Sequence, residues 1–302
     1  MPDHVVTQQS GVEGVEKSST QAAQVAQFNV QQTPQPRLEA YDTCRYTPVA
    51  EGVSLFSRWS GNGRGEPLLF LHGNRDNHSH FTELQSILAA QWSTVAIDLR
   101  GHGFSSKIDC PLSVDLFAED LAAFIAYHGW EKVTLIGHSL GAVTSMVYAL
   151  NHPERVARLV LMGVAAYYEM PWQRPPEVTE ETYQEVLKET NRRAAPFFFP
   201  EEYPEVRRRV EASWSSIVFP VHRNLIKLIR PDLRSRVGQL NMPTLVLTGE
   251  QDKSKPAGST QWLSEHIPGA KLAVIPRTGH FMFMERPTEV SGHIQQFLEL
   301  AR

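Results

Sequence analysis

Val133-Thr-Leu-Ile-Gly-His-Ser-Leu-Gly141 is the stretch of sequence that decides the fold. Its first four residues are large and apolar or β-branched, and they predict a short buried strand. Leu140, Val143 and Val147 then recur at the spacing of one helix face. A strand therefore runs directly into a helix, with Gly137-His-Ser-Leu-Gly141 as the corner between them.

This corner fits the Gly-x-Ser-x-Gly pattern of a nucleophile elbow, in which a serine sits on a strained turn above a sheet. The flanking glycines allow the strand and the helix to pass closely. We therefore predict that Ser139 is a nucleophile. An ordinary glycine-rich turn between a strand and a helix is the alternative, so the prediction depends on partners for the serine elsewhere in the chain.

Size and composition are those of a globular protein with a sizeable core. The chain has 302 residues, of which 41% are hydrophobic and 21% charged. The 29 basic and 33 acidic residues are spread along the chain and give a net charge of −4, which argues against binding to nucleic acid or to an anionic membrane. Arg207–Arg209 lies among glutamates and is expected to be a solvated helix face.

The sequence predicts a cytoplasmic protein. It contains no apolar run long enough to cross a bilayer, and Asp3 and His4 stand where a secretory signal would carry basic residues. Cys44 and Cys110 have no metal-ligand spacing and are expected to be free thiols. A disulfide between the two is the alternative. Residues 1–40 are poor in aromatic side chains and are expected to form a disordered tail.

From residue 41 onward, strand patterns alternate with helix patterns, which predicts an α/β fold with a mostly parallel sheet. The expected strands cover residues 46–50, 53–59, 67–71, 94–97, 133–136, 158–162, 244–248 and 271–275. The expected helices include residues 116–126, the helix after the elbow, and residues 289–301.

The alternation breaks over residues 166–236, which are rich in aromatic side chains and contain helical patterns at 179–192 and 204–215. We predict a helical cap here, inserted between a first part of the core at 41–165 and a second part at 237–302. An additional helical layer packed on the core is the alternative.

A serine nucleophile needs a base to accept its proton and usually a carboxylate to orient that base. The strand at 244–248 runs into Asp252, and the strand at 271–275 runs into His280. Loops beyond the carboxyl ends of parallel strands meet at one edge of a sheet, where α/β proteins bind ligands. We therefore predict a Ser139–His280–Asp252 triad, with Glu250 as the alternative acid.

The developing oxyanion also needs donors, preferably backbone N–H groups. Leu140, the first residue of the elbow helix, offers one such N–H. The second is expected from Asn74, in the loop that follows the strand at 67–71.

These segments together resemble the α/β-hydrolase family over residues 45–302. The motifs that carry the resemblance are His72-Gly73-Asn74, Asp98-Leu-Arg-Gly-His-Gly103, Gly137-His-Ser-Leu-Gly141, Gly249-Glu-Gln-Asp252 and Gly279-His280. The resemblance implies an eight-stranded sheet with one antiparallel strand near its start, a cap after the sixth strand, and a structural role for the segment 98–103. Ala142 departs from the second glycine of many members, a change expected only to tighten helix packing.

The resemblance also implies which members of the family this chain is not. Haloalkane dehalogenases and epoxide hydrolases of this fold carry aspartate at the elbow, so Ser139 argues against both. Two further signals predict no chemistry. The His-x-His within residues 76–80 precedes a helix and is expected to supply caps rather than metal ligands, and Cys110 is expected to be inert.

The sequence thus predicts a serine hydrolase that uses no cofactor and no metal and cleaves an ester, lactone or related acyl bond of a small apolar substrate. Cleavage of a carbon–carbon bond in a ring-fission diketone, formation of a peracid, acyl transfer and cyclisation would use the same triad and stay open. A ligand-binding protein built on the same fold is an alternative of another class. The oligomeric state and the substrate are not encoded in any local pattern.

Overall fold

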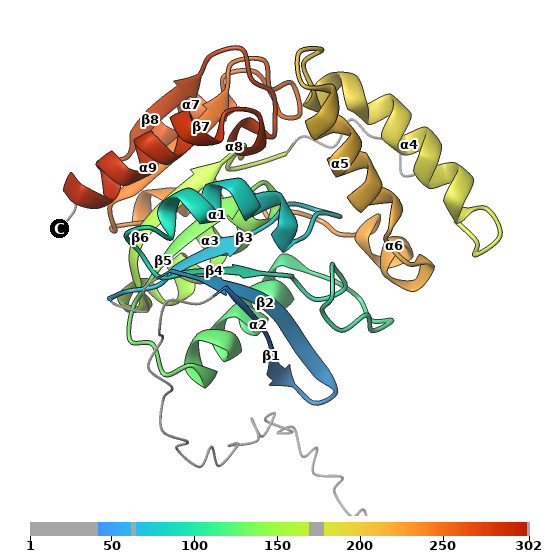
Figure 1. The fold of residues 1–302 in the computed structure, drawn as a ribbon, viewed down its shortest axis with the longest axis horizontal. Coiled ribbons are helices and arrows are strands. Elements are labelled where there is room, and N and C mark those ends of the chain that lie inside the picture. The colour runs from blue at the N-terminus through green and yellow to red at the C-terminus, as the bar shows by residue number, and fades with distance from the viewer. Residues whose placement is uncertain (1–41, 62–64, 169–177, 301–302) are drawn as a thin grey trace, which may run out of the picture. The chain divides into compact units, whose positions relative to one another are not determined.

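The computed structural model describes residues 42–61, 65–168 and 178–300, so the predicted tail at residues 1–40 lies outside the described residues. The described strands form an eight-stranded sheet in the order β1-β2-β4-β3-β5-β6-β7-β8 (Figure 1). Strand β2 runs antiparallel to both of its neighbours, and every other pair is parallel. The strands are β1 (Thr43–Ala50), β2 (Val53–Ser60), β3 (Leu68–Leu71), β4 (Thr94–Ile97), β5 (Val133–His138), β6 (Val156–Met162), β7 (Thr244–Gly249) and β8 (Lys271–Ile275).

Helices cover both faces of this sheet, as predicted, because alternate side chains of a strand point to opposite sides. In β3, Leu69 and Leu71 join one buried cluster together with side chains of α2 and α3. Leu68 and Phe70 join the other cluster, together with side chains of α1 and α9. The helices of the core are α1 (Thr82–Leu88), α2 (Val114–Tyr127), α3 (Leu140–Asn151), α7 (Ser259–His266), α8 (Met282–Glu285) and α9 (Pro287–Leu300).

Three helices, α4 (Tyr183–Phe198), α5 (Pro204–Ser215) and α6 (Phe219–Leu225), lie between β6 and β7 in the chain and form the cap. Figure 1 shows them, in yellow to orange, beyond one end of the sheet. The cap packs on the core through aromatic rings, since Phe199 stacks on Phe281 with ring centroids 5.3 Å apart. The prediction of a helical cap insertion is confirmed, whereas its boundaries at residues 166 and 236 stay a prediction.

The bounds of β4, β8 and α5 are those predicted from the sequence. Helices α6, α7 and α8 were not predicted, because they are short and their patterns are brief. Cys44 and Cys110 are free thiols, as predicted. None of the helices in the described part of the chain combines the length and apolar character that crossing a bilayer requires.

Candidate active site

Ser139 occupies the sharp turn between β5 and α3, with φ 50° and ψ −112°. Positive φ is rare for a residue with a side chain, and the surrounding structure must hold it in place. The neighbouring glycines explain how it is held. A Cβ on Gly141 would lie 2.1 Å from the carbonyl oxygen of Leu71, and one on Gly137 would lie 2.5 Å from Ala142 Cα. The strand, the turn and the helix can therefore approach this closely only with glycine at both positions.

The predicted acid, Asp252, and the predicted base, His280, come from the loops after β7 and β8, which are neighbouring parallel strands. The Nδ1–H of His280 donates to Asp252 Oδ2 over 2.9 Å, and both side chains are buried. Burial opposes ionisation of Asp252, but His280 and Lys255 hold the pKa of this carboxyl well below its ordinary value. Asp252 is therefore ionised and fixes the Nδ1–H tautomer of His280, which leaves Nε2 free to accept a proton.

The cap supports both of these loops through backbone hydrogen bonds. The N–H of His280 donates to the carbonyl of Phe198 at the end of α4 over 2.8 Å, and the N–H of Lys253 donates to the carbonyl of Phe197 over 3.0 Å. The Phe198 ring lies edge-on to the His280 ring, with centroids 4.9 Å apart. The end of α4 thus positions the predicted base and places an aromatic side chain beside it.

The elbow and the base lie next to each other. The Nε2–H of His138 donates to the carbonyl of His280 over 3.1 Å, and the two rings are 4.5 Å apart between centroids. Among the described residues, however, no hydrogen bond joins the Ser139 hydroxyl to the His280 ring. Such bonds are often long before substrate binds, so the nucleophilic role of Ser139 stays a prediction.

The two predicted oxyanion donors belong to segments that lie close together. Leu140 is the first residue of α3, and a helix leaves the first of its N–H groups without internal partners. Asn74 follows Gly73, where an added Cβ would lie 3.3 Å from Ser139 Cβ. The loop after β3 therefore approaches the elbow closely, and the roles of the Leu140 and Asn74 N–H groups stay a prediction. Glu250, the alternative acid, accepts instead from the N–H of Arg277 over 2.9 Å and is not joined to His280.

A buried carboxylate that the sequence did not single out lies beneath this site. Asp76 Oδ1 accepts from the Trp214 indole N–H of α5 over 2.8 Å, and Asp76 Oδ2 lies 3.6 Å from His138 Nδ1. Burial opposes its charge, but His80 and His138 hold the pKa of Asp76 below its ordinary value. Asp76 therefore links the cap to the elbow. In the same segment, Asn77 caps the 3₁₀ turn at His78–Phe81, as the cap prediction expected.

Asp98, in the segment that resembles the family's loop after β4, has a structural role. Its carboxylate accepts from the N–H and ring Nδ1–H of His78 and from the N–H of Phe104. A Cβ on Gly103 would lie 2.0 Å from Asp98 Oδ2, so this loop closes around the carboxylate only with glycine there.

The fold and this arrangement define a class of enzyme. The chain matches the α/β hydrolase fold family over residues 66–287 and belongs to that family. It is an α/β-hydrolase enzyme with an eight-stranded sheet and a helical cap.

Its relatives are hydrolases with different substrates. The 2-(acetamidomethylene)succinate hydrolase of Mesorhizobium japonicum is 26% identical over 78% of this chain and 89% of its own length. A 2-hydroxy-6-oxononadienedioate/2-hydroxy-6-oxononatrienedioate hydrolase of Pseudomonas putida is also 26% identical, over 84% of this chain and 96% of its own length. The structure of a thermophilic esterase from Thermogutta terrifontis superposes with a TM-score of 0.71 and 25% identity, covering 87% of this chain and 99% of that one.

Proposed function

We propose that the protein is a serine hydrolase that cleaves an ester or lactone of a small, largely apolar substrate through an acyl-enzyme on Ser139. The observation that carries this proposal is the buried hydrogen bond between Asp252 and His280 beside a serine on a strained elbow. The rings of Phe198 from the cap and Phe281 from the core contact His280, Phe199 stacks on Phe281, and these aromatic side chains favour an apolar acyl group.

In the first half of the reaction, His280 Nε2 takes the proton of the Ser139 hydroxyl while Oγ attacks the carbonyl carbon. The N–H groups of Leu140 and Asn74 stabilise the oxyanion that forms. His280 then gives its proton to the leaving alkoxide oxygen as the carbon–oxygen bond breaks. Asp252 stabilises the imidazolium between these two transfers.

In the second half, a water molecule gives a proton to His280 and attacks the acyl carbon of the ester on Ser139. Collapse of the second tetrahedral intermediate breaks the bond to Oγ, and His280 returns the proton to the serine. The products are the carboxylic acid and the regenerated enzyme, so that no redox partner or cofactor takes part in this sequence.

Replacement of Ser139 by Ala tests the proposal. Hydrolysis of p-nitrophenyl esters should fall by roughly 10⁴-fold or more, and labelling by a fluorophosphonate probe should disappear. The variant Ser264→Ala changes a serine on α7, away from the elbow, and should keep both. Labelling of the Ser139→Ala protein would show that another residue is the nucleophile.

Cleavage of a carbon–carbon bond in a ring-fission diketone is a second candidate, favoured by the similarity to the Pseudomonas putida hydrolase named above. It would use the same serine, base and acid. A panel of acyl esters of increasing chain length, lactones and a dienoate diketone separates the two, since a carbon–carbon hydrolase should prefer the diketone by orders of magnitude.

A further inference from the structure

The carboxylate of Asp252 has more partners than a simple triad requires. One oxygen, Oδ1, accepts from both the N–H and the hydroxyl of Ser254, over 3.0 and 2.6 Å. The other, Oδ2, accepts from His280 and also from the Nζ of Lys255. The same carboxylate oxygen therefore faces the predicted catalytic base on one side and a lysine ammonium group on the other.

Lys255 is placed for this contact and not for solvent. Its side chain is only 5% exposed and that of Asp252 is fully buried. Removing an ammonium group from water costs several kcal/mol unless a good partner offsets the cost. Lys253, two residues earlier in the same loop, is exposed. The burial of Lys255 is therefore specific to its position and is not shared by the other lysine of this loop.

A cation on Asp252 changes what that carboxylate does for His280. An unpaired carboxylate stabilises the imidazolium, because the negative charge lies beside the ring. A lysine ammonium on the same oxygen offsets part of that charge and weakens this stabilisation.

Ser254 adds a second constraint on the same ring. Its hydroxyl donates to Asp252 Oδ1, and its oxygen lies 2.9 Å from His280 Nδ1, where it can accept part of the Nδ1–H bond. The imidazole is thus held in one orientation by a neutral oxygen as well as by the carboxylate. The orientation of the His280 ring therefore does not depend on the full negative charge of Asp252.

We propose that Lys255 is a positioning residue that acts through Asp252 on the His280 ring, and so sets the acid limit of hydrolysis. The proposal rests on the function proposed above, in which His280 is the base. It assigns Lys255 no contact with the substrate.

Other charged or titratable groups face the same pair. His138 lies against the His280 ring, and burial and then the charge of His280 lower its pKa, although Asp76 opposes this shift. The buried phenol of Tyr168 has a raised pKa and is neutral. Glu285 accepts from the N–H of Gly279 over 2.6 Å, and burial raises its pKa to about 7. Glu285 therefore titrates within the pH range of the experiment, and its contribution must be removed by substitution before the pH profiles are compared.

The experiment measures kcat/KM for a p-nitrophenyl ester between pH 5 and 9, with the full chain in a Glu285→Gln background. In Lys255→Met, the acid limb of the profile should move to higher pH by about one unit, which is about a tenfold loss below the limb and little loss at pH 9. Lys255→Arg should restore the limb, and Lys253→Met should leave it in place.

A uniform fall in kcat/KM with an unmoved limb would show that Lys255 only supports the loop, and would overturn the proposal. If Lys255→Met does not fold, Lys255→Gln carries the same test, because it keeps a donor on the carboxylate without the charge. Absence of Ser139-dependent ester hydrolysis in the parent protein would refute the proposed function itself. An unmoved limb with intact Ser139-dependent hydrolysis would refute only the role of Lys255.

Discussion

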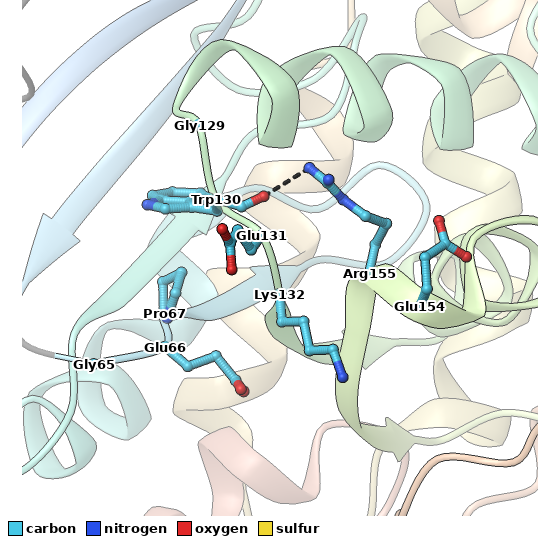
Figure 2. Close-up of a pocket in the computed structure, with 9 residues that line it drawn as sticks. All are labelled: Gly65, Glu66, Pro67, Gly129, Trp130, Glu131, Lys132, Glu154 and Arg155. Carbon is cyan, nitrogen blue, oxygen red and sulfur yellow. Dashed lines mark hydrogen bonds between the residues drawn. The ribbon is translucent and has the colours of Figure 1, made fainter.

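The two ends of the parallel strands differ in the side chains and cavities that lie beside them. At the carboxyl ends, buried charged side chains bind one another, as Asp252 and His280 do. At the amino ends, a depression of about 710 Å³ opens beside the segments just before β3, β5 and β6 (Figure 2). Figure 2 shows Lys132 and Glu154 there, with Arg155 donating to the carbonyl of Trp130 over 2.7 Å. A hollow with charged walls is therefore found at one edge, and the groups suited to chemistry at the other.

Backbone strain follows the same division. The non-glycine residues with positive φ in the described part of the chain are Arg75, Ser139 and Arg277, and each follows the carboxyl end of a strand. Strained backbone and buried charge both cost stability, and they persist where the surrounding structure holds them. Backbone strain and buried charge therefore occur together at the candidate active site of this protein.

The largest expected effect on stability concerns Glu285, at the carboxyl edge. Burial raises its pKa from 4.5 to about 7, so the folded protein binds a proton that the unfolded chain has lost between these values. This contribution is fully present below pH 4.5 and is lost as the pH rises through 7. In Glu285→Gln that loss is absent, so the variant should gain roughly 3 kcal/mol over the wild type between pH 4.5 and 8.

Urea denaturation at pH 4.5 and 8 measures this difference, and comparison with the wild type cancels the contributions of the buried histidines. Glu131→Gln at the amino edge, where Glu131 is exposed, serves as the matched control and should show almost no pH-dependent difference. If Glu285→Gln and Glu131→Gln showed the same pH-dependent change in the free energy of unfolding, the two edges of the sheet would not differ in buried charge.

A smaller effect is expected from the indole bond between cap and core. Trp214→Phe removes the donor to the buried Asp76 carboxylate and should lower the free energy of unfolding by about 2 kcal/mol. Trp130→Phe at the amino edge changes the same side chain at a half-buried position, where the ring stacks on His128 instead of binding a buried carboxylate, and should cost less than Trp214→Phe. Chemical denaturation of both variants gives the comparison, and similar costs would contradict a cap held by a buried charge.

The sequence was informative where strand ends alone position a side chain. Asp252 and His280 each follow a strand, and because β7 and β8 pair in parallel their loops must meet. Lys255 was not predicted, because the order of residues within a loop does not say which side chain turns inward. The contact of Trp214 with Asp76 joins residues 138 positions apart and depends on how the cap docks, which no local pattern encodes.

The smallest expected effect tests the amino edge directly. Glu66 accepts from Arg158 over 3.3 Å at the rim of the depression, and both side chains are partly exposed, so water screens the pair. Glu66→Gln keeps an oxygen for the Thr134 hydroxyl and should cost less than about 1 kcal/mol in urea denaturation. Ester hydrolysis should be unchanged, because the substitution lies at the opposite ends of the strands from Ser139. A fall in kcat/KM of more than roughly twofold in a stably folded variant would mean that the amino edge takes part in the reaction, and that buried charge and strain do not by themselves locate the site.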